Sequence, residues 1–211
     1  MRMAFLRLFT AICPPSPAVD RICDTQNDLR RLISTDSVRW VIEANLHLTL
    51  QFFGDVDTGQ VDAVKECMKA AVEECDTRNP IPLAVVGVGA FPNATRARVI
   101  WTGVDDLSGR LNTIDRALRQ QLRKATVAFD EKPFRPHITL GYVRRRAAPH
   151  DRRDIAQAIH DLKPETVSFF AESLCLIQST LSSDGARYAN LYSVGLAPES
   201  SATSSGDNAR E

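Results

Sequence analysis

The feature that most constrains the fold of this chain is a short pattern that occurs twice, far apart in the sequence. Residues 46–50 read LHLTL, and residues 136–140 read PHITL. Successive side chains of a β-strand point to opposite faces. The aliphatic residues of each copy therefore predict a buried face, and the His and Thr of each copy predict an open face. The fold must therefore contain two strands that each place aliphatic residues in a core and a His and a Thr on the opposite face.

Hydrophobic periodicity around the two copies predicts a repeated order of elements. We expect strands over 4–12, 38–56, 81–91, 98–104, 134–143, 167–178 and 187–196, and helices over 16–34, 61–75, 107–124 and 151–162. A helix, a strand with the motif, another helix and a pair of strands thus occur twice. The prediction is an α+β fold of two pseudo-symmetric lobes, each an antiparallel sheet with outer helices, around a central cleft.

Turn residues set the expected boundaries of these elements. Gly54-Asp55 is expected to end the first motif strand, and the Asp-Gly at 184–185 to connect the last two strands as a hairpin. From Pro198 onward the sequence is polar and serine-rich, which is typical of disorder. We therefore expect one bilobal domain over residues 1–197 and a disordered tail over 198–211.

Charge, cysteine content and hydropathy limit the possible classes of function. The net charge is +0, with a pI near 6.9, so a nucleic-acid partner would need a local site rather than a broad basic surface. The five cysteines have no metal-ligand spacing, and we interpret them as reduced thiols. No apolar run approaches the ~20 residues that cross a bilayer. Arg7 interrupts the apolar N-terminal run, so a cytoplasmic location is expected.

The repeated motif suits phosphodiester chemistry. If the lobes face each other, His47 with Thr49 and His137 with Thr139 line one cleft. In-line displacement at phosphorus needs a base on the side of the attacking oxygen and an acid on the side of the leaving oxygen. Imidazole serves in both roles near neutral pH, and hydroxyls donate hydrogen bonds to the non-bridging oxygens. This scheme requires no metal or cofactor, and its symmetry does not decide which imidazole is the acid.

A single histidine on a strand is more often structural than catalytic. The repetition of histidine, threonine and an aliphatic floor in both copies argues against that interpretation here. His150 and His160 belong to no repeated pattern, and we expect them to be solvated or structural.

With these motifs the chain resembles the two-histidine (2H) phosphoesterases, in particular the RNA 2′,3′-cyclic phosphodiesterases once described as 2′-5′ RNA ligases. The stretches RLFTAI, WVIEANLHLTLQFFGDV, RVIWTGV and FRPHITL carry this resemblance, which extends over residues 4–197. It implies metal-independent hydrolysis of an RNA terminal 2′,3′-cyclic phosphate to a 2′-phosphate. His47 would be the proton donor and His137 the proton acceptor, and Thr49 and Thr139 would hold the phosphate.

The expected partner is an RNA 3′ end or a nucleotide that carries a 2′,3′-cyclic phosphate, bound by a monomer. Residues 131–153 contain seven basic and two acidic residues, which form either an RNA track or a solvated turn. Arg135 is the best single candidate for a substrate contact. Tyr142 stands where many relatives have arginine, which leaves the contacts at that position open. Phe53, Phe134 and Tyr142 are expected either to stack on a base or to pack.

Two other functions remain possible from the sequence. The same chemistry could act on a small nucleotide, such as a 2′-5′ oligoadenylate or an ADP-ribose cyclic phosphate. Alternatively, the cleft could hold RNA ends without turning them over. Intact copies of both motifs argue against a module that only binds, because binding does not need a matched acid and base.

Overall fold

The structure is a computed structural model that describes residues 4–33, 35–75, 79–182 and 185–196. Its helices and strands follow in the order β1 (Phe5–Ile12), α1 (Ser16–Leu32), β2 (Val38–Trp40), β3 (Leu48–Asp57), α2 (Val61–Glu73), β4 (Ile81–Phe91), β5 (Val99–Asp106), α3 (Arg110–Lys124), β6 (His137–Val143), α4 (Pro149–Asp161), β7 (Val167–Ala171), β8 (Ser173–Ser182) and β9 (Gly185–Gly195). The tail from Pro198 and Asp184 of the expected hairpin turn lie outside the described residues.

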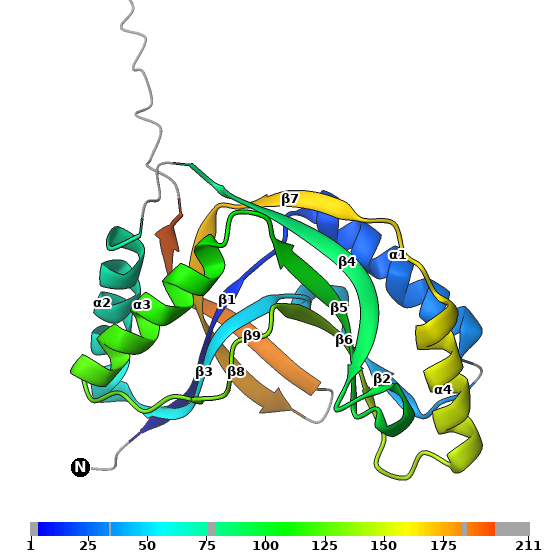
Figure 1. Cartoon of the computed structure of the whole chain (residues 1–211). Coiled ribbons are helices and arrows are strands. Elements are labelled where there is room, and N and C mark those ends of the chain that lie inside the picture. The colour runs from blue at the N-terminus through cyan, green and yellow to red at the C-terminus, as the bar shows by residue number, and fades with distance from the viewer. Residues whose placement is uncertain (1–3, 34, 76–78, 183–184, 197–211) are drawn as a thin grey trace, which may run out of the picture.

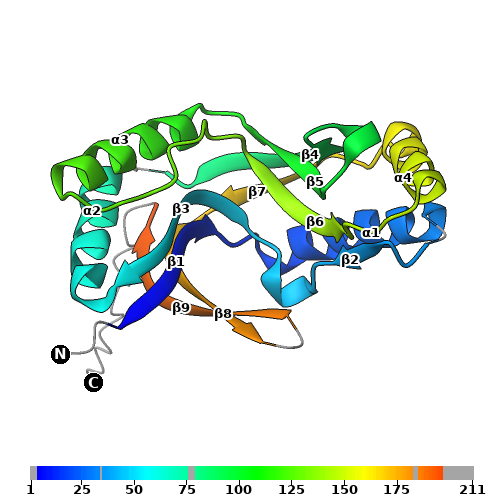
Figure 2. The same ribbon diagram turned by 90° about the horizontal axis from the view of Figure 1, so that it is seen from below.

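All strands pair in one curled antiparallel sheet, in the order β7-β4-β5-β6-β3-β1-β8-β9, with β2 also paired to β6. Apart from β2, the sheet consists of two halves of four strands each, which join where Leu48 of β3 pairs with Ile138 of β6. Figures 1 and 2 show α2 beside α3 at one end of the molecule and α1 beside α4 at the other. The predicted α+β architecture of two lobes with outer helices is confirmed.

The main core lies between the helices and one face of this sheet. It contains the aliphatic residues of both motifs, including Leu48 and Leu140, together with helix residues such as Met68 and Leu118. This arrangement follows from alternation, because the period of two in each strand places every second side chain against the helices. The His and Thr residues are therefore left on the opposite, concave face.

Three expected boundaries were wrong. The stretch 38–56 contains β2, a 3-10 turn over Glu43–Asn45 and β3, since β2 pairs with β6 whereas β3 also pairs with β1. Gly54 does not end β3; it adopts a φ of 74° next to a register shift, and the strand continues to Asp57. The helix expected from 107 begins at Arg110, after Gly109 takes a φ of 72°.

The stretch 167–178 is likewise two strands rather than one. It divides at Glu172, so that β7 pairs with β4 at one edge of the sheet and β8 pairs with β1 in the other half. The polar residues Glu172 and Ser173 lie at this point, but they do not show that the chain changes its partner strand there. Within the described ranges, no helix is long and apolar enough to cross a membrane.

Candidate active site

The two motifs lie side by side on the concave face where the halves of the sheet join. Leu48 pairs with Ile138, and both side chains are fully buried. Continuing this antiparallel register by one residue places His47 opposite Thr139 and Thr49 opposite His137. The two histidines are thus diagonal neighbours, which lie roughly 7–8 Å apart in a regular sheet.

His47 is held at both ring nitrogens. Its Nδ1 lies 2.7 Å from the main-chain oxygen of Asn45, and its Nε2 lies 2.9 Å from Oγ1 of Thr49. A carbonyl oxygen only accepts hydrogen bonds, so Nδ1 carries the hydrogen in the neutral ring and Nε2 exchanges the proton. The amide of Asn45 in turn donates to the main-chain oxygen of Ala186, which ties the turn to β9.

His137 repeats this arrangement at the first residue of β6. Its Nδ1 lies 2.6 Å from the main-chain oxygen of Arg135. Arg135 precedes His137 by two residues, just as Asn45 precedes His47. The same reasoning makes Nε2 of His137 the atom that exchanges a proton. No described residue forms a hydrogen bond with this Nε2, whereas Nε2 of His47 contacts Thr49.

Each imidazole is also packed against aromatic rings from its own half of the sheet. The ring centroid of His47 lies 4.8 Å from that of Phe9 and 5.3 Å from that of Tyr188. The centroid of His137 lies 4.9 Å from that of Phe91 and 6.3 Å from that of Trp101. These aromatic contacts restrain the planes of the two imidazole rings and exclude water from them.

Burial lowers the pKa of both histidines below the usual value, because desolvation disfavours the charged ring. The hydrogen bond from each Nδ1 to a carbonyl opposes this effect. The charge of His137 lowers the pKa of His47 further, so protonation of one ring disfavours protonation of the other. The site thus favours at most one charged imidazole near neutral pH.

A cavity of about 420 Å³ opens beside the second motif, and Thr49 and His137 are among the residues that line it. Three phenylalanines, Phe52, Phe91 and Phe134, give it apolar walls. Its lining also includes three basic side chains, of which Arg119 pairs with Asp115 and Lys132 pairs with Asp130, while Arg135 is exposed. Apolar walls together with the exposed cation of Arg135 suit a nucleoside whose phosphate lies at the motif residues.

The remaining predicted site residues are also placed by the structure. Thr139 is half-buried on β6 opposite Trp101. Arg135 precedes β6 rather than lying on it; its side chain is exposed and lines the cavity. Phe134 lines the cavity too, but Phe53 is 8% exposed and belongs to the core, so it cannot stack on a base. Simple alternation from Thr49 would place Phe53 on the open face, but a register shift between β1 and β3 at residues 49–51 turns it to the buried face.

Other expectations concern residues outside the motifs. Tyr142 is 40% exposed, and the guanidinium of Arg39 lies 5.2 Å from the centroid of its ring. Part of the basic segment is tied to the protein itself: Arg144 donates to the main-chain oxygen of Asp36, and Arg152 to that of Ala97. His150 lies 3.1 Å from a carboxylate oxygen of the adjacent Asp151.

Sequence reasoning missed the four aromatic residues around the histidines. Phe9 and Tyr188 come from β1 and β9, and Phe91 and Trp101 come from β4 and β5. Their only local signal is a place in the strand alternation, and that signal does not tell which motif they meet.

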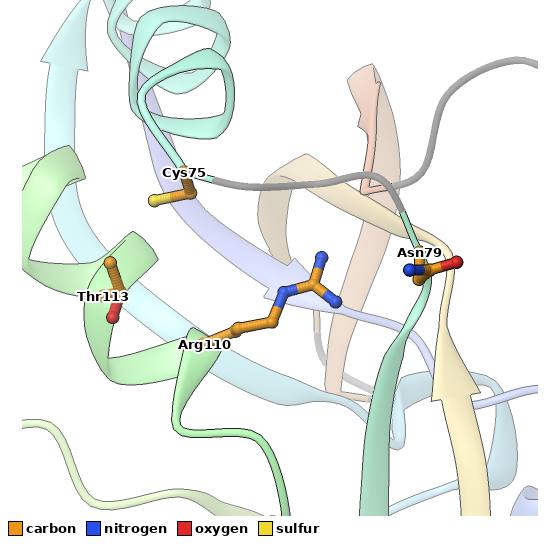
Figure 3. A pocket seen from close by; sticks show the side chains of 4 residues that line it. All are labelled: Cys75, Asn79, Arg110 and Thr113. Carbon is orange, nitrogen blue, oxygen red and sulfur yellow. The ribbon is translucent and has the colours of Figure 1, made fainter.

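A second cavity, of about 340 Å³, is lined by Cys75, Asn79, Arg110 and Thr113 and by none of the motif residues (Figure 3).

Comparison with known proteins identifies the family. The family model of the 2′-5′ RNA ligase superfamily matches residues 19–182. The RNA 2′,3′-cyclic phosphodiesterase of Aquifex aeolicus is 31% identical over 156 residues, which are 71% of this chain and 77% of that protein. The RNA 2′,3′-cyclic phosphodiesterase of Methanothermobacter thermautotrophicus is 28% identical over 188 residues, which are 88% and 96% of the two chains.

A solved structure shares the whole arrangement. E. coli LigT complexed with ATP superposes with a TM-score of 0.68 at 25% sequence identity, over 92% of this chain and 99% of LigT. The family match contains both histidine motifs and most of the strands that position them. This chain belongs to the 2′-5′ RNA ligase superfamily, the two-histidine phosphoesterases.

Proposed function

We propose that this protein is an RNA 2′,3′-cyclic phosphodiesterase that hydrolyses the terminal cyclic phosphate to a 2′-phosphate without a metal ion. The observation that carries the proposal is the matched pair of imidazoles on neighbouring strands. Each ring has its Nδ1 on a main-chain carbonyl, which leaves Nε2 as the nitrogen that exchanges a proton at the concave face; Nε2 of His47 contacts Oγ1 of Thr49 there. The names of the Aquifex and Methanothermobacter relatives support the same substrate class.

In this mechanism water attacks phosphorus while the bond from phosphorus to the 3′ oxygen breaks. Neutral His137 takes a proton from the water, and protonated His47 gives a proton to the departing 3′ oxygen. The hydroxyls of Thr49 and Thr139 donate hydrogen bonds to the non-bridging oxygens as negative charge develops there. Exchange of one proton with solvent at each ring then restores the starting state.

The cavity beside His137 supports a nucleoside as the group attached to the phosphate. Its volume, about 420 Å³, accommodates a base and a ribose, and Arg135 at its rim supplies positive charge for an adjacent phosphate. The same size favours a second candidate, in which the substrate is a small nucleotide rather than an RNA end. We propose that the protein acts as a monomer, because a single chain supplies both imidazoles. We further propose a cytoplasmic location, because the five cysteines are interpreted as reduced thiols.

The direct test is turnover of an oligonucleotide that ends in a 2′,3′-cyclic phosphate, in excess EDTA, with identification of the product isomer. We expect a 2′-phosphate product. His47→Ala and His137→Ala should each lower turnover by about 10²–10⁴-fold. The exposed His160 provides the matched control, because His160→Ala should leave turnover unchanged. Binding without turnover would refute an enzyme, and loss of turnover in EDTA would refute metal independence.

The acid and base roles can be separated with a modified substrate. If sulfur replaces the bridging 3′ oxygen, the leaving group is a thiolate, which needs no proton because a thiol has a pKa of about 8.5. On this substrate His47→Ala should regain most of the lost turnover, whereas His137→Ala should regain none. The opposite pattern would exchange the two roles. A comparison of dinucleotide and longer RNA substrates would separate an RNA end from a small nucleotide.

A further inference from the structure

The second cavity lies where the end of α2 meets the start of α3 (Figure 3). Its volume is about 340 Å³, and Cys75, Asn79, Arg110 and Thr113 line it. Cys75 follows α2, Asn79 precedes β4, and Arg110 is the first residue of α3. None of these residues lines the cavity beside the second motif, so the second cavity is separate from the candidate active site.

The side chain of Arg110 extends from α3 into the space between Cys75 and Asn79 (Figure 3). Its Nη1 donates to the main-chain oxygen of Pro80 at 3.4 Å, which is long for a hydrogen bond. Nε and Nη2 are shielded from solvent, and neither has a hydrogen-bond partner among the residues that the structure describes. A shielded charge is normally paired, because its burial without a partner is unfavourable. Arg110 therefore has the environment of a cation that binds an anion from outside the chain.

The two nitrogen atoms without partners belong to the same edge of the guanidinium. Nε and Nη2 carry parallel N–H groups, and an oxyanion accepts hydrogen bonds from both in a bidentate pair. Arg110 also begins a helix of 15 residues, and the positive end of the helix dipole favours negative charge nearby. The geometry of this edge thus favours a planar or tetrahedral oxyanion over a simple halide ion.

The rest of the lining also suits an anion. The amide of Asn79 forms no hydrogen bond with any residue in the described part of the chain, so it is available as a donor. Burial and the charge of Glu74 raise the pKa of Cys75, against the effect of Arg110, so Cys75 stays a neutral thiol near neutral pH. The carboxylate of Glu74 accepts a hydrogen bond from Gln121 at 3.1 Å, and the described lining of the cavity contains no carboxylate.

We propose that this cavity binds a small phosphate-bearing ligand, whose oxygens accept hydrogen bonds from the Nε–Nη2 edge of Arg110 and from the amide of Asn79. A phosphate group fits better than a carboxylate, because the arginine edge uses two oxygens and only a phosphate has another for the amide. The guanidinium turns its shielded edge toward the ligand by giving up the long contact with Pro80. The inference goes beyond the proposed function and does not depend on it.

The size of the cavity limits the ligand. Sites for small molecules occupy roughly 300–1,000 Å³, and this cavity, of about 340 Å³, lies near the lower end of that range. It therefore suits inorganic phosphate or a small phosphomonoester rather than an oligonucleotide. The two sources share the phosphate group, and titration with inorganic phosphate and with ribose 5-phosphate distinguishes them by which of the two binds more tightly.

The test follows the Nε–H resonance of Arg110 by NMR in the ¹⁵N-labelled full chain, during titration with inorganic phosphate at constant ionic strength. The resonance is assigned by its loss in Arg110→Met. We expect a saturable shift with phosphate and a much smaller one with acetate. Arg110→Lys, followed by isothermal calorimetry, should weaken this site about tenfold, because an ammonium group cannot make the bidentate pair. Arg123→Met, at the exposed far end of α3, is the matched control and should leave the titration unchanged.

Several outcomes would overturn the inference. An Nε–H resonance that does not move, or that moves without saturation, would exclude the site. An equal shift with acetate would exclude the preference for phosphate. Phosphate could also bind at the motifs, and the ring C–H resonances of His47 and His137 report that event separately; a shift there with none at Arg110 would count against the second site. If Arg110→Met does not fold, Arg110→Lys keeps the charge and supplies the assignment, because it too lacks the Nε–H group.

Discussion

The position of Trp101 depends on the absence of a side chain at Gly89. The two residues face each other across β4 and β5, and the indole ring lies directly over the glycine. A Cβ atom at position 89 would lie 2.4 Å from Cζ2 and Cη2 of that ring. Carbon atoms in ordinary contact are about 3.5–4.0 Å apart, so the ring would have to move by about 1 Å or more.

This movement would reach His137 through the aromatic cluster. The ring centroid of Trp101 lies 5.2 Å from that of Phe91 and 6.3 Å from that of His137. Overpacking of this kind costs about 1–3 kcal/mol of stability, and a ~1 Å displacement of a catalytic group costs up to about 10²-fold in rate. For Gly89→Ala we expect the free energy of unfolding to fall by about 1–3 kcal/mol and kcat to fall about tenfold to a hundredfold.

The assay is a double-mutant cycle with Trp101→Phe, measured by urea unfolding and by turnover of the cyclic phosphate. A phenyl ring lacks the outer atoms that meet the added Cβ atom, so Gly89→Ala should cost less than about 0.5 kcal/mol in the Trp101→Phe background. An equal cost in both backgrounds would show that the clash is not the cause. Unchanged kcat in Gly89→Ala would refute the role of the aromatic wall in positioning His137.

Three further measurements test the site and its support. Thr49→Val removes the hydroxyl at Nε2 of His47 and should lower kcat about tenfold to a hundredfold, whereas Thr49→Ser should keep most of it. Gln26→Met removes a buried amide that donates at 2.8 Å to two main-chain oxygens, so it should lower the free energy of unfolding by about 1–3 kcal/mol. Gln178→Met is the control, because the amide of Gln178 forms no hydrogen bond with any residue that the structure describes. The value of kcat/KM should fall at low pH, where the base His137 is protonated, and at high pH, where the acid His47 is deprotonated. Because burial lowers the pKa of both histidines, the pH optimum should lie below about 6.5. A pH optimum on the alkaline side of neutrality would contradict the proposed environment of the two rings.

Local pattern was sufficient to predict most of the elements and the faces of the motif strands. Alternation alone placed Leu48 and Leu140 in the core and left His47 with Thr49 on the other face, as the hydrogen bond between them requires. The lengths of the helices follow from the 3.6-residue period of their apolar residues. These features depend on neighbours in the sequence, and therefore one sequence is enough to find them.

Features that depend on distant pairing were not predictable in this way. The division of 167–178 at Glu172 is decided by which strand each piece meets, and nothing in the apolar run records that choice. The rings of Tyr188 and Trp101 reach the histidines only after the sheet has formed.

The two histidines have the same support but unequal surroundings, and this inequality favours different roles. Nε2 of His47 is engaged by Thr49, the charge of His137 lowers its pKa, and its wall includes the phenol of Tyr188. His137 instead borders the cavity, and no described residue bonds its Nε2. A base that activates water must be reachable by that water, which His137 is. An acid must present its proton to one leaving atom, and the contact with Thr49 restrains the orientation of the His47 ring.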